Sequence, residues 1–357
     1  MRKRIFLIGL ILMLAFSLAA CGGQEQTSEH TKTITDCMGR TVEIPEDPQR
    51  VACLYASTAH MMAMLDEQDK IVGAPNGVKS DVLMQMKYPE IEEIATPYQE
   101  GSINVEELLR IEADLALIRY ATAEDEGETE KLDELGIPYV VVDYLSIEEL
   151  ETAISVMGEV FNKEDRARKY IEFGRETMNL VSKRLKDVPK KGRPSVFHSV
   201  NEAIRTDGKG DICVEIMNLA GVKNAAAEHG VKAGGDKTYT TLEEIYNWEP
   251  DAFLANEYSV TDYILSDSKW AGLNAVKEKK VYTLPVGATR WCHPGSMEAH
   301  MGVLAIARMF YPEQFADLDM EQYTADYYKT CFGLELDSRT IEQILAGKGM
   351  RASNSPS

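Results

Sequence analysis

The sequence has no excess of basic residues, which argues against a protein that binds nucleic acid. Its 38 lysine and arginine residues are outnumbered by 58 aspartate and glutamate residues, and the formal net charge is −20. Nucleic-acid-binding domains usually carry a basic patch or stripe, and the sequence shows no such stripe. The chain of 357 residues is long enough for two domains.

Motifs of the common enzyme and metal-site classes are also missing. There is no HExxH, GxSxG or GxxxxGK[ST] motif, and the DGKG segment at 207–210 is too short for a phosphate-binding loop. Apart from Cys21, the five cysteines are widely spread without a CxxC pair, so neither a disulfide framework nor a zinc knuckle is indicated. No paired spacing of histidine and carboxylate suggests a metal cage. We therefore predict no catalytic residue, no cofactor and no metal site.

The first 20 residues have the organisation of a secretion signal. Arg2, Lys3 and Arg4 precede the apolar run Ile5–Phe16, and small residues lead to Cys21. The run is shorter than the ~20 residues of a membrane span. The tetrapeptide LAAC at 18–21 resembles a bacterial lipobox, in which the cysteine carries the lipid after cleavage. We predict a signal peptide at 1–20, a lipidated Cys21, a polar tether at 21–33 and an extracytoplasmic, membrane-anchored protein. The alternative is a plain secreted protein.

A long amphipathic helix is predicted between residues 163 and 188. Its apolar residues fall at spacings of three and four, which places them on one helix face: Ala167, Tyr170, Ile171, Gly174, Met178, Val181 and Leu185. Asn162 is the predicted N-cap, and Pro189 follows as a stop. Similar chain architecture appears on both sides, so we interpret 161–189 as a bridge between two lobes rather than an ordinary surface helix.

Strands alternate with helices on both sides of this bridge. The pattern predicts an α/β fold of two Rossmann-like lobes with parallel sheets, at 34–160 and 190–350. The segment VEELLRIEADLALI at 105–118 recurs as LEEIYNWEPDAFLA at 242–255, with every position displaced by 137. This repeat indicates the same helix–corner–strand unit in each lobe. Ligands of open α/β sheets bind beyond the carboxyl ends of the strands, which predicts a site in a cleft between the lobes.

In the order of its segments, the chain resembles the class III substrate-binding proteins of ABC importers, which serve iron–siderophore complexes, haem, cobalamin and some oxyanions. The bridge helix carries this resemblance together with TDCMGRTVEIPEDPQRV, INVEELLRIEADLALI, DICVEIMNLAGVKN, TLEEIYNWEPDAFLANE and WAGLNAVKEKKVYTLP. The resemblance covers nearly all of 33–332. It implies a monomer that captures a metal chelate and delivers it to a permease and its ATPase. In this family each lobe offers an acidic residue to the permease, and the matching positions are Glu106 and Glu243. Both could equally serve the helix dipole.

The loop GATRWCHPG at 287–295 is the most unusual candidate for ligand contact. Arg290 offers a planar fork for a carboxylate or oxyanion, Trp291 an apolar face, and His293 a ring that can hydrogen-bond or ligate a metal. Alternatively, Trp291 packs between helices and His293 caps one. The other ligand-binding candidates lie at strand ends and in loops: Tyr55, Tyr98, Arg119, Tyr120, Arg205, Tyr239 and Asn256. His60 and His300 fall within helices and are expected to be core or surface residues.

The sequence leaves the identity of the ligand open. Arginine and histidine suit carboxylate- or phenolate-rich iron chelates, the propionates and amides of haem or corrinoids, or an oxyanion such as molybdate or tungstate. A bare metal-ion receptor would need several converging histidines and carboxylates. An extracellular lipoprotein enzyme on the same fold is the third hypothesis. A stiff bridge predicts a largely preformed cleft with modest hinge movement.

Overall fold

The structure is a computed structural model that describes residues 30–232 and 237–349. The chain divides into a short N-terminal unit, 1–31, and one compact unit that begins at Lys32. The predicted signal peptide and Cys21 lie outside the described residues, and they remain predictions. Within the described part of the chain, no helix is both long and apolar enough to cross a bilayer.

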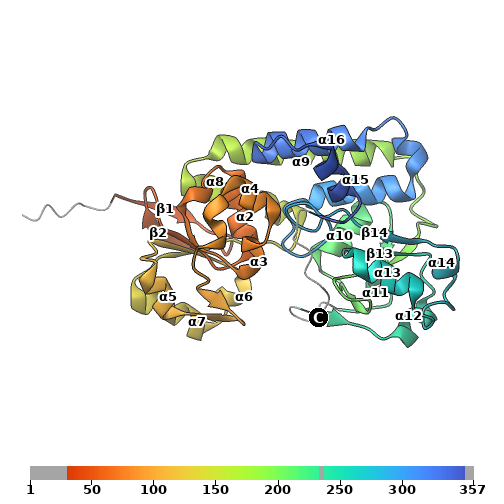
Figure 1. The fold of residues 1–357 in the computed structure, drawn as a ribbon, viewed down its shortest axis with the longest axis horizontal. Helices are drawn as coiled ribbons and strands as arrows, with labels where there is room; N and C mark the ends of the chain where they lie inside the picture. The colour runs from red at the N-terminus through yellow and green to blue at the C-terminus, as the bar shows by residue number, and fades with distance from the viewer. Residues whose placement is uncertain (1–29, 233–236, 350–357) are drawn as a thin grey trace, which may run out of the picture. The chain divides into compact units, whose positions relative to one another are not determined.

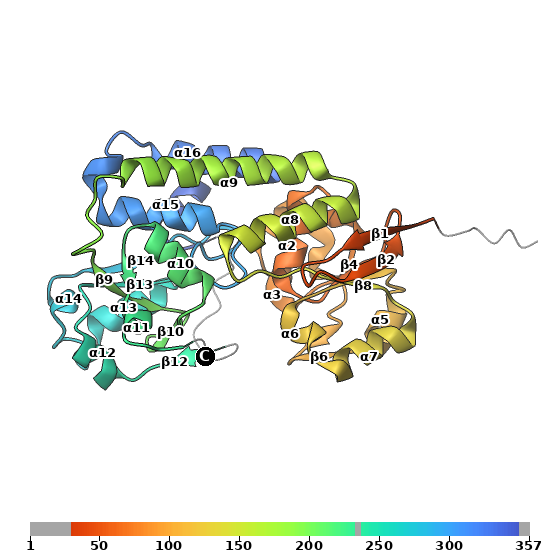
Figure 2. The ribbon, with the colours of Figure 1, turned by 180° about the vertical axis from the view of Figure 1, so that it is seen from behind.

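Two four-stranded parallel sheets form the framework of the compact unit (Figures 1 and 2). Every strand pair within these two sheets is parallel. The first sheet has the order β4 (Ile71–Gly73), β3 (Val51–Cys53), β7 (Leu115–Ile118) and β8 (Tyr139–Val141). The second has the order β11 (Lys223–Asn224), β9 (Ser195–Ser199), β13 (Ala252–Ala255) and β14 (Val281–Thr283). The predicted fold class, two α/β lobes with parallel sheets, is therefore confirmed.

Helices follow the strands in both halves. The first half contains α2 (Ala56–Met64), α3 (Asn76–Lys79), α4 (Val82–Lys87), α5 (Val105–Arg110), α6 (Tyr120–Ala123), α7 (Glu126–Leu135) and α8 (Ile147–Phe161). The second contains α10 (Ile212–Leu219), α11 (Ala225–Glu228), α12 (Leu242–Trp248), α13 (Tyr258–Ser266), α14 (Asn274–Lys277), α15 (Ala299–Phe310), α16 (Met320–Tyr327) and α17 (Ser338–Leu345). A π-helical turn, η4 (Tyr328–Phe332), extends α16.

Three short two-stranded sheets complete the framework. They are β1 (Thr31–Thr35) with β2 (Thr41–Pro45), β5 (Tyr98–Gln99) with β6 (Ser102–Ile103), and β10 (Arg205–Thr206) with β12 (Thr238–Tyr239). The first of these is a hairpin that precedes the first parallel sheet. The strands of the other two have only two residues each, which is too short to show an alternating pattern in the sequence.

The bridging helix is α9 (Glu164–Arg184), whose 21 residues span about 32 Å at 1.5 Å per residue. It packs against α8 of the first half and against α15 and η4 (Figure 2). Near its start, Arg166 donates a hydrogen bond of 2.7 Å to the carbonyl of Met64. At its end, Arg184 donates one of 2.5 Å to the carboxylate of Asp317. The helix is therefore attached to both halves by charged side chains as well as by its apolar face.

The predicted cap of this helix was wrong. Lys163 occupies the N-cap position, whereas Asn162 ends the preceding helix α8 in the left-handed conformation, with φ of 55°. Asparagine tolerates this conformation better than most residues. The Asn162 side chain accepts a hydrogen bond from Lys32 and donates one to the carbonyl of Glu46. The C-cap of α8 and the N-cap of α9 are adjacent residues, so the sequence did not show which helix Asn162 belongs to.

The sequence repeat corresponds to the same local structure in each half. Glu112 and Glu249 both adopt the left-handed conformation, with φ of 47° and 46°, and turn the chain from a helix into a strand. Two residues later, Asp114 accepts a hydrogen bond from the backbone N–H of Arg50, and Asp251 accepts one from Ser195. Each aspartate thus ties its own strand to the start of the neighbouring strand. The equivalence of the two halves extends to single hydrogen bonds.

The main hydrophobic core is continuous between the two halves. One cluster of buried residues runs from Ile34 and Leu150 through Val181 of α9 to Val196 and Leu304. Two smaller clusters lie within the second and first halves respectively. Separating the halves would expose part of the shared cluster, at a cost of roughly 25 cal/mol per Å² of apolar surface. This packing favours small relative movements of the two sheets.

Candidate functional site

The carboxyl ends of the two parallel sheets lie close to each other. Tyr55 follows β3 of the first sheet, and Gly295 lies in the segment after β14 of the second. A Cβ atom placed on Gly295 would lie 2.8 Å from the Tyr55 hydroxyl oxygen. A second contact joins the halves nearby, where the backbone N–H of Ile147 donates to Glu215 at 3.0 Å. The two halves therefore meet beside Tyr55, at one of the strand ends where the site is predicted.

Arg119 and Tyr55 lie close together at the carboxyl end of the first sheet. Arg119 follows β7 as the N-cap of α6, and its guanidinium carbon lies 5.3 Å from the centroid of the Tyr55 ring. Such a cation–π contact holds the guanidinium over an apolar face. Asp143 is close by and accepts a hydrogen bond of 3.0 Å from the backbone N–H of Tyr120. Burial raises the pKa of Asp143, and the positive charge of Arg119 opposes this effect.

The other two aromatic candidates of the first half contact their own half. The Tyr98 hydroxyl accepts a hydrogen bond of 3.4 Å from Thr122, and the Tyr120 hydroxyl donates one of 3.4 Å to the carbonyl of Cys37. Burial raises the pKa of Tyr120 to about 12, so the phenol stays neutral at physiological pH. Both rings remain candidates for one wall of the site, with Tyr120 directly next to Arg119.

In the second half, Arg290 is held by an acidic partner. Its Nε donates a hydrogen bond of 2.7 Å to Glu257, and a second guanidinium nitrogen binds the same carboxylate oxygen. Glu257 follows β13 and Arg290 follows β14, so the ion pair joins two neighbouring strand ends. An anionic ligand would therefore meet a guanidinium that is already partly neutralised. His293 is half-buried, and its Nδ1 lies 2.6 Å from the carbonyl oxygen of Pro294.

Glu298 shapes this loop and was missed in the sequence. Its buried carboxylate accepts hydrogen bonds from the backbone N–H groups of Ala288 and Thr289, at 2.9 and 2.7 Å, and one of 2.5 Å from the Tyr328 hydroxyl. Burial raises the pKa of Glu298, and the hydrogen-bond donors counteract it. Gly287 lies against the same groups, because a Cβ there would overlap the Tyr328 hydroxyl. The available sequence signal was an acidic residue at the start of the mostly apolar segment 297–310.

Two of the predicted ligand residues are completely buried. Trp291 lies in the main core cluster with no exposed surface, so its side chain packs between elements, as the alternative interpretation of this residue had it. Asn256 accepts a hydrogen bond of 2.7 Å from the backbone N–H of Asn201 and donates one of 3.5 Å to the carbonyl of Cys292. It joins the loops after β9, β13 and β14. In this conformation both side chains support the site from within rather than face a ligand.

Arg205 and Tyr239 are brought together, although not in the way the sequence indicated. Both lie in short strands rather than loops, and they stand opposite each other in the antiparallel pair of β10 and β12. The Tyr239 ring is 47% exposed, and its hydroxyl donates a hydrogen bond of 2.8 Å to Glu202. This pair forms a small polar group at one margin of the second half.

A cavity of about 620 Å³ lies next to the start of α8 and α10. It is lined by Leu145, Ser146, Lys190, Arg193, Gly210, Asp211, Val214, Glu215, Asn218 and Leu219. None of the predicted ligand residues lines it. Its charged residues have both signs, so it does not define the charge of a ligand.

Glu106 and Glu243 occupy equivalent exposed positions in the first turns of α5 and α12. Their neighbours in the sequence are engaged, since Glu107 pairs with Arg110 and Glu244 forms a capping box with Thr241. Within the described residues, neither Glu106 nor Glu243 makes a hydrogen bond or an ion pair. Both views show α5 and α12 away from α9 (Figures 1 and 2).

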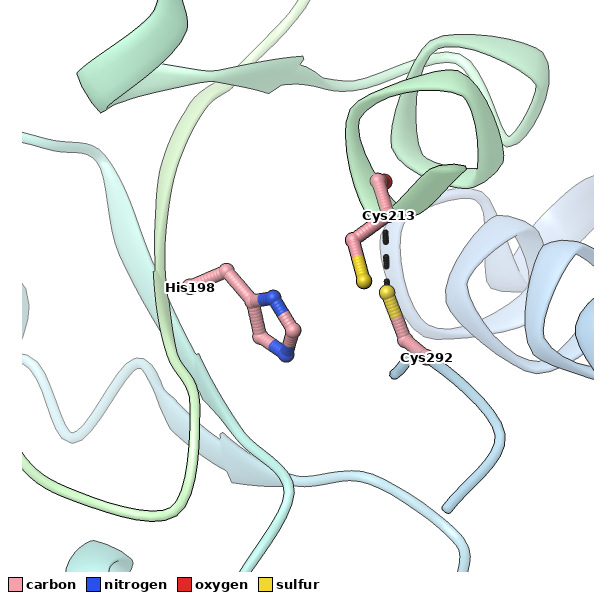
Figure 3. Close-up of side chains that lie close together, drawn as sticks. All are labelled: His198, Cys213 and Cys292. Carbon is pink, nitrogen blue, oxygen red and sulfur yellow. Dashed lines mark hydrogen bonds between the residues drawn. The ribbon is translucent and has the colours of Figure 1, made fainter. Parts of the chain in front are cut away.

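The structure also gathers three residues that the sequence kept apart: His198, Cys213 and Cys292 (Figure 3). No short spacing links them, so sequence patterns could not reveal the cluster. His60 and His300, in contrast, are core residues, 1% and 2% exposed, as expected from their positions within helices.

Together, the two similar parallel sheets, the bridging helix and the charged and aromatic residues at facing strand ends define a two-lobed solute-binding protein. The match to a family model agrees: residues 51–286 match the family described as periplasmic binding protein. The chain belongs to this family, and it is a substrate-binding component of an ABC importer.

Individual relatives are similar over most of their length. The chain is 27% identical to the molybdate-binding protein MolA of Haemophilus influenzae over 92% of this chain and 95% of that protein. The structure of MolA bound to molybdate superposes with a TM-score of 0.77 and 26% identity, covering 86% of this chain and 99% of that chain. The uncharacterized ABC transporter substrate-binding lipoprotein YvrC of Bacillus subtilis is 26% identical over 89% of this chain and 100% of its own length. The iron(3+)-hydroxamate-binding protein YxeB of B. subtilis is 22% identical over 79% of this chain and 89% of its own length.

Proposed function

We propose that this chain captures a metal chelate, namely an iron–siderophore complex, haem or a corrinoid, at the carboxyl ends of its two sheets and delivers it to the permease. The observation that carries this proposal is the pair of Arg119 and Tyr55, which presents a guanidinium and an aromatic face next to Gly295 of the opposite half. A guanidinium can bind the carboxylate or phenolate oxygens of a chelate, and an aromatic ring can pack against its apolar surface. The similarity to a protein named for iron(3+)-hydroxamate binding supports the chelate class.

An oxyanion of the molybdate type is the second candidate ligand. The similarity to a molybdate-binding protein over almost the full chain favours it. An oxyanion needs several hydrogen-bond donors around a small volume and no aromatic wall. Arg119 serves both ligands, whereas Tyr55 and Tyr120 favour the larger chelate.

We also propose that the protein acts as a lipid-anchored monomer without catalytic turnover. The LAAC motif at Cys21 and the similarity to a protein named a lipoprotein support the anchor. The relatives are binding proteins, and their names describe no reaction. Labelling of the expressed protein with a radioactive fatty acid tests the anchor, and Cys21→Ser should abolish the label.

For delivery, we propose that Glu106 and Glu243 contact basic residues of the permease. Both carboxylates are exposed and stand at matching positions of the structural repeat. In reconstituted transporter, E106R and E243R should reduce ligand-stimulated ATP hydrolysis while ligand affinity stays unchanged. The control is E90R, which changes another exposed glutamate of the first half. Full stimulation with both docking variants would contradict the assignment.

The ligand class is tested by thermal unfolding with a panel of compounds. Ferric hydroxamate and catecholate siderophores, haem, cobalamin and molybdate are added singly to the purified protein. Binding at a hundredfold excess over Kd stabilises the folded state by about 2.7 kcal/mol. A response to a chelate supports the main proposal, and a response to molybdate alone supports the second. If a bare divalent ion stabilises the protein while the whole panel is silent, the chelate proposal is wrong.

The location of the site is tested with Arg119→Ala. Loss of a charge-assisted contact should weaken binding of the identified ligand by about 1.5–3 kcal/mol, or roughly 10- to 100-fold. The matched control is Arg110→Ala, which removes an exposed arginine whose ion pair among the described residues is with Glu107 on α5. Equal affinity for both variants would remove Arg119 from the site.

A further inference from the structure

The cluster of His198, Cys213 and Cys292 has the composition of a metal site. A ring nitrogen of His198 and the two sulfur atoms all lie within 4.8 Å of one another (Figure 3). The three residues come from β9, from the first turn of α10 and from the loop after β14. All three are completely buried. The fold therefore brings one imidazole and two thiols together at one buried position of the second half.

The surroundings of His198 supply an independent observation. Its Nδ1 lies 2.6 Å from a carboxylate oxygen of Asp207, which is itself 2% exposed. Its Nε2 is buried and has no hydrogen-bond partner among the described residues. A buried polar atom without a partner costs about 1–3 kcal/mol and calls for an explanation. Metal-ligating histidines usually contact a carboxylate through one ring nitrogen, and this fixes the ring for the metal.

The other buried cysteines of the chain lack these features. Cys53 is also completely buried, but its sulfur lies 3.4 Å from the sulfur of Met62 within the main apolar core. A cysteine of this kind behaves as a small apolar residue. Cys213 and Cys292 differ because a second thiol, an imidazole and a carboxylate stand beside them. Ordinary core packing explains Cys53 and leaves the polar pair His198–Asp207 unexplained.

We propose that His198, Cys213 and Cys292 hold a resident thiophilic cation, with Zn²⁺ as the ion that fits this donor set. Zinc in proteins is bound by thiolates and imidazole, and soft thiolates select it over Mg²⁺ or Ca²⁺. Binding would replace the two thiol protons, which pass to solvent, and the two thiolates would balance the charge of the ion. This ion is separate from the transported ligand, since its ligands are buried inside the second half.

A bound ion would link the parts of the second half that surround the ligand site. Cys292 lies two residues from Arg290, Cys213 lies in the first turn of α10, and His198 lies in the central strand β9. The ion would therefore fix the loop that carries Arg290 against the sheet. It would stabilise the loop without contacting the transported ligand.

The experiment is a zinc titration of the full-length protein, purified under reducing, oxygen-free conditions and competed against a chromophoric chelator. We expect one Zn²⁺ per chain, and with Co²⁺ as a spectroscopic substitute we expect thiolate-to-metal charge-transfer bands. C213S, C292S and H198A should each weaken binding at least tenfold and diminish these bands. The control C37S changes a half-buried cysteine outside the cluster and should bind as the parent does. Circular dichroism identifies variants that fold, and a cluster variant that fails to fold is replaced by C213A or C292A.

Three outcomes would overturn the proposal. The reduced protein could bind no Zn²⁺ with an affinity above that of the chelator. The cluster variants could bind as tightly as C37S, which would place the ion elsewhere. Alternatively, the intact mass could reveal a Cys213–Cys292 disulfide in the protein as isolated, with no zinc bound after its reduction. Because the ligand panel does not depend on these cysteines, a negative result here leaves the proposed transport function standing.

Discussion

Acidification should destabilise this protein through one buried histidine, His300 on α15. Its ring is 2% exposed and is surrounded by aromatic side chains of the bridging helix and of α16, with Tyr170 and Tyr327 at centroid distances of 5.2 and 5.4 Å. Burial lowers the pKa of His300 from 6.5 to about 3. The folded protein therefore keeps this ring neutral, whereas the unfolded chain protonates it near pH 6.5.

The sign of the effect follows from proton linkage. Between pH 6.5 and 3 the unfolded chain binds one more proton at this site than the folded protein, so acid favours unfolding. The free energy of unfolding should be about 2 kcal/mol lower at pH 5 than at pH 7.5 from this residue alone. Above pH 7 this loss of unfolding free energy disappears, because His300 is then neutral in both the folded and the unfolded state.

The measurement compares the parent with His300→Leu and His300→Gln by urea denaturation at pH 5 and pH 7.5. Other groups add to the acid sensitivity of both proteins, so the informative quantity is the difference between them. The variants should lose about 2 kcal/mol less than the parent on acidification, whatever their stability at pH 7.5. Equal losses in parent and variants would refute the reasoning, as would an NMR titration in which the folded His300 ring protonates near pH 6.5.

Four further substitutions test local packing and hydrogen bonding by urea denaturation. Gly302→Ala places a Cβ 2.0 Å from the carbonyl oxygen of Trp291, so it should cost at least 1–3 kcal/mol, and a neutral effect would contradict the observed packing. Glu298→Gln puts an NH₂ donor against backbone N–H groups, so we expect a loss of about 1–3 kcal/mol and weaker ligand binding; unchanged values would show that this loop is held in another way. Asp251→Ala removes the acceptor for the backbone N–H of Ser195, with an expected cost of about 1 kcal/mol, and Asp114→Ala in the first half should cost a similar amount.

Patterns formed by residues within one short segment of the sequence predicted the fold well. The repeat segment 242–255, for example, forms the helix Leu242–Trp248 and the strand Ala252–Ala255, as the helix–corner–strand pattern indicated. The repeat at a displacement of 137 corresponds to equivalent strands β7 and β13 in the two sheets. Such elements are encoded by local periodicity and by capping residues, and both can be read without knowing the tertiary structure.

The site was predicted less completely, because its residues meet only through the tertiary fold. Arg119 and Tyr55 were both proposed from strand ends, but their contact depends on neighbouring strands in the sheet. Trp291 was placed in the cleft because its loop is unusual, yet tertiary packing buries it. The cluster of His198 with two distant cysteines was missed, because the sequence was searched only for metal-ligand motifs with short spacings. Such rules detect sites made by one segment and miss sites assembled from three.

The anchoring of α9 at both ends has a consequence for transport. Arg166 fastens the early part of the helix to one half, and Arg184 fastens its last turn to the other. A rod fixed in this way resists swinging, so a captured molecule is not expected to escape through spontaneous wide opening. We therefore expect separation of the two halves, and with it release of the ligand, to depend on contact with the permease.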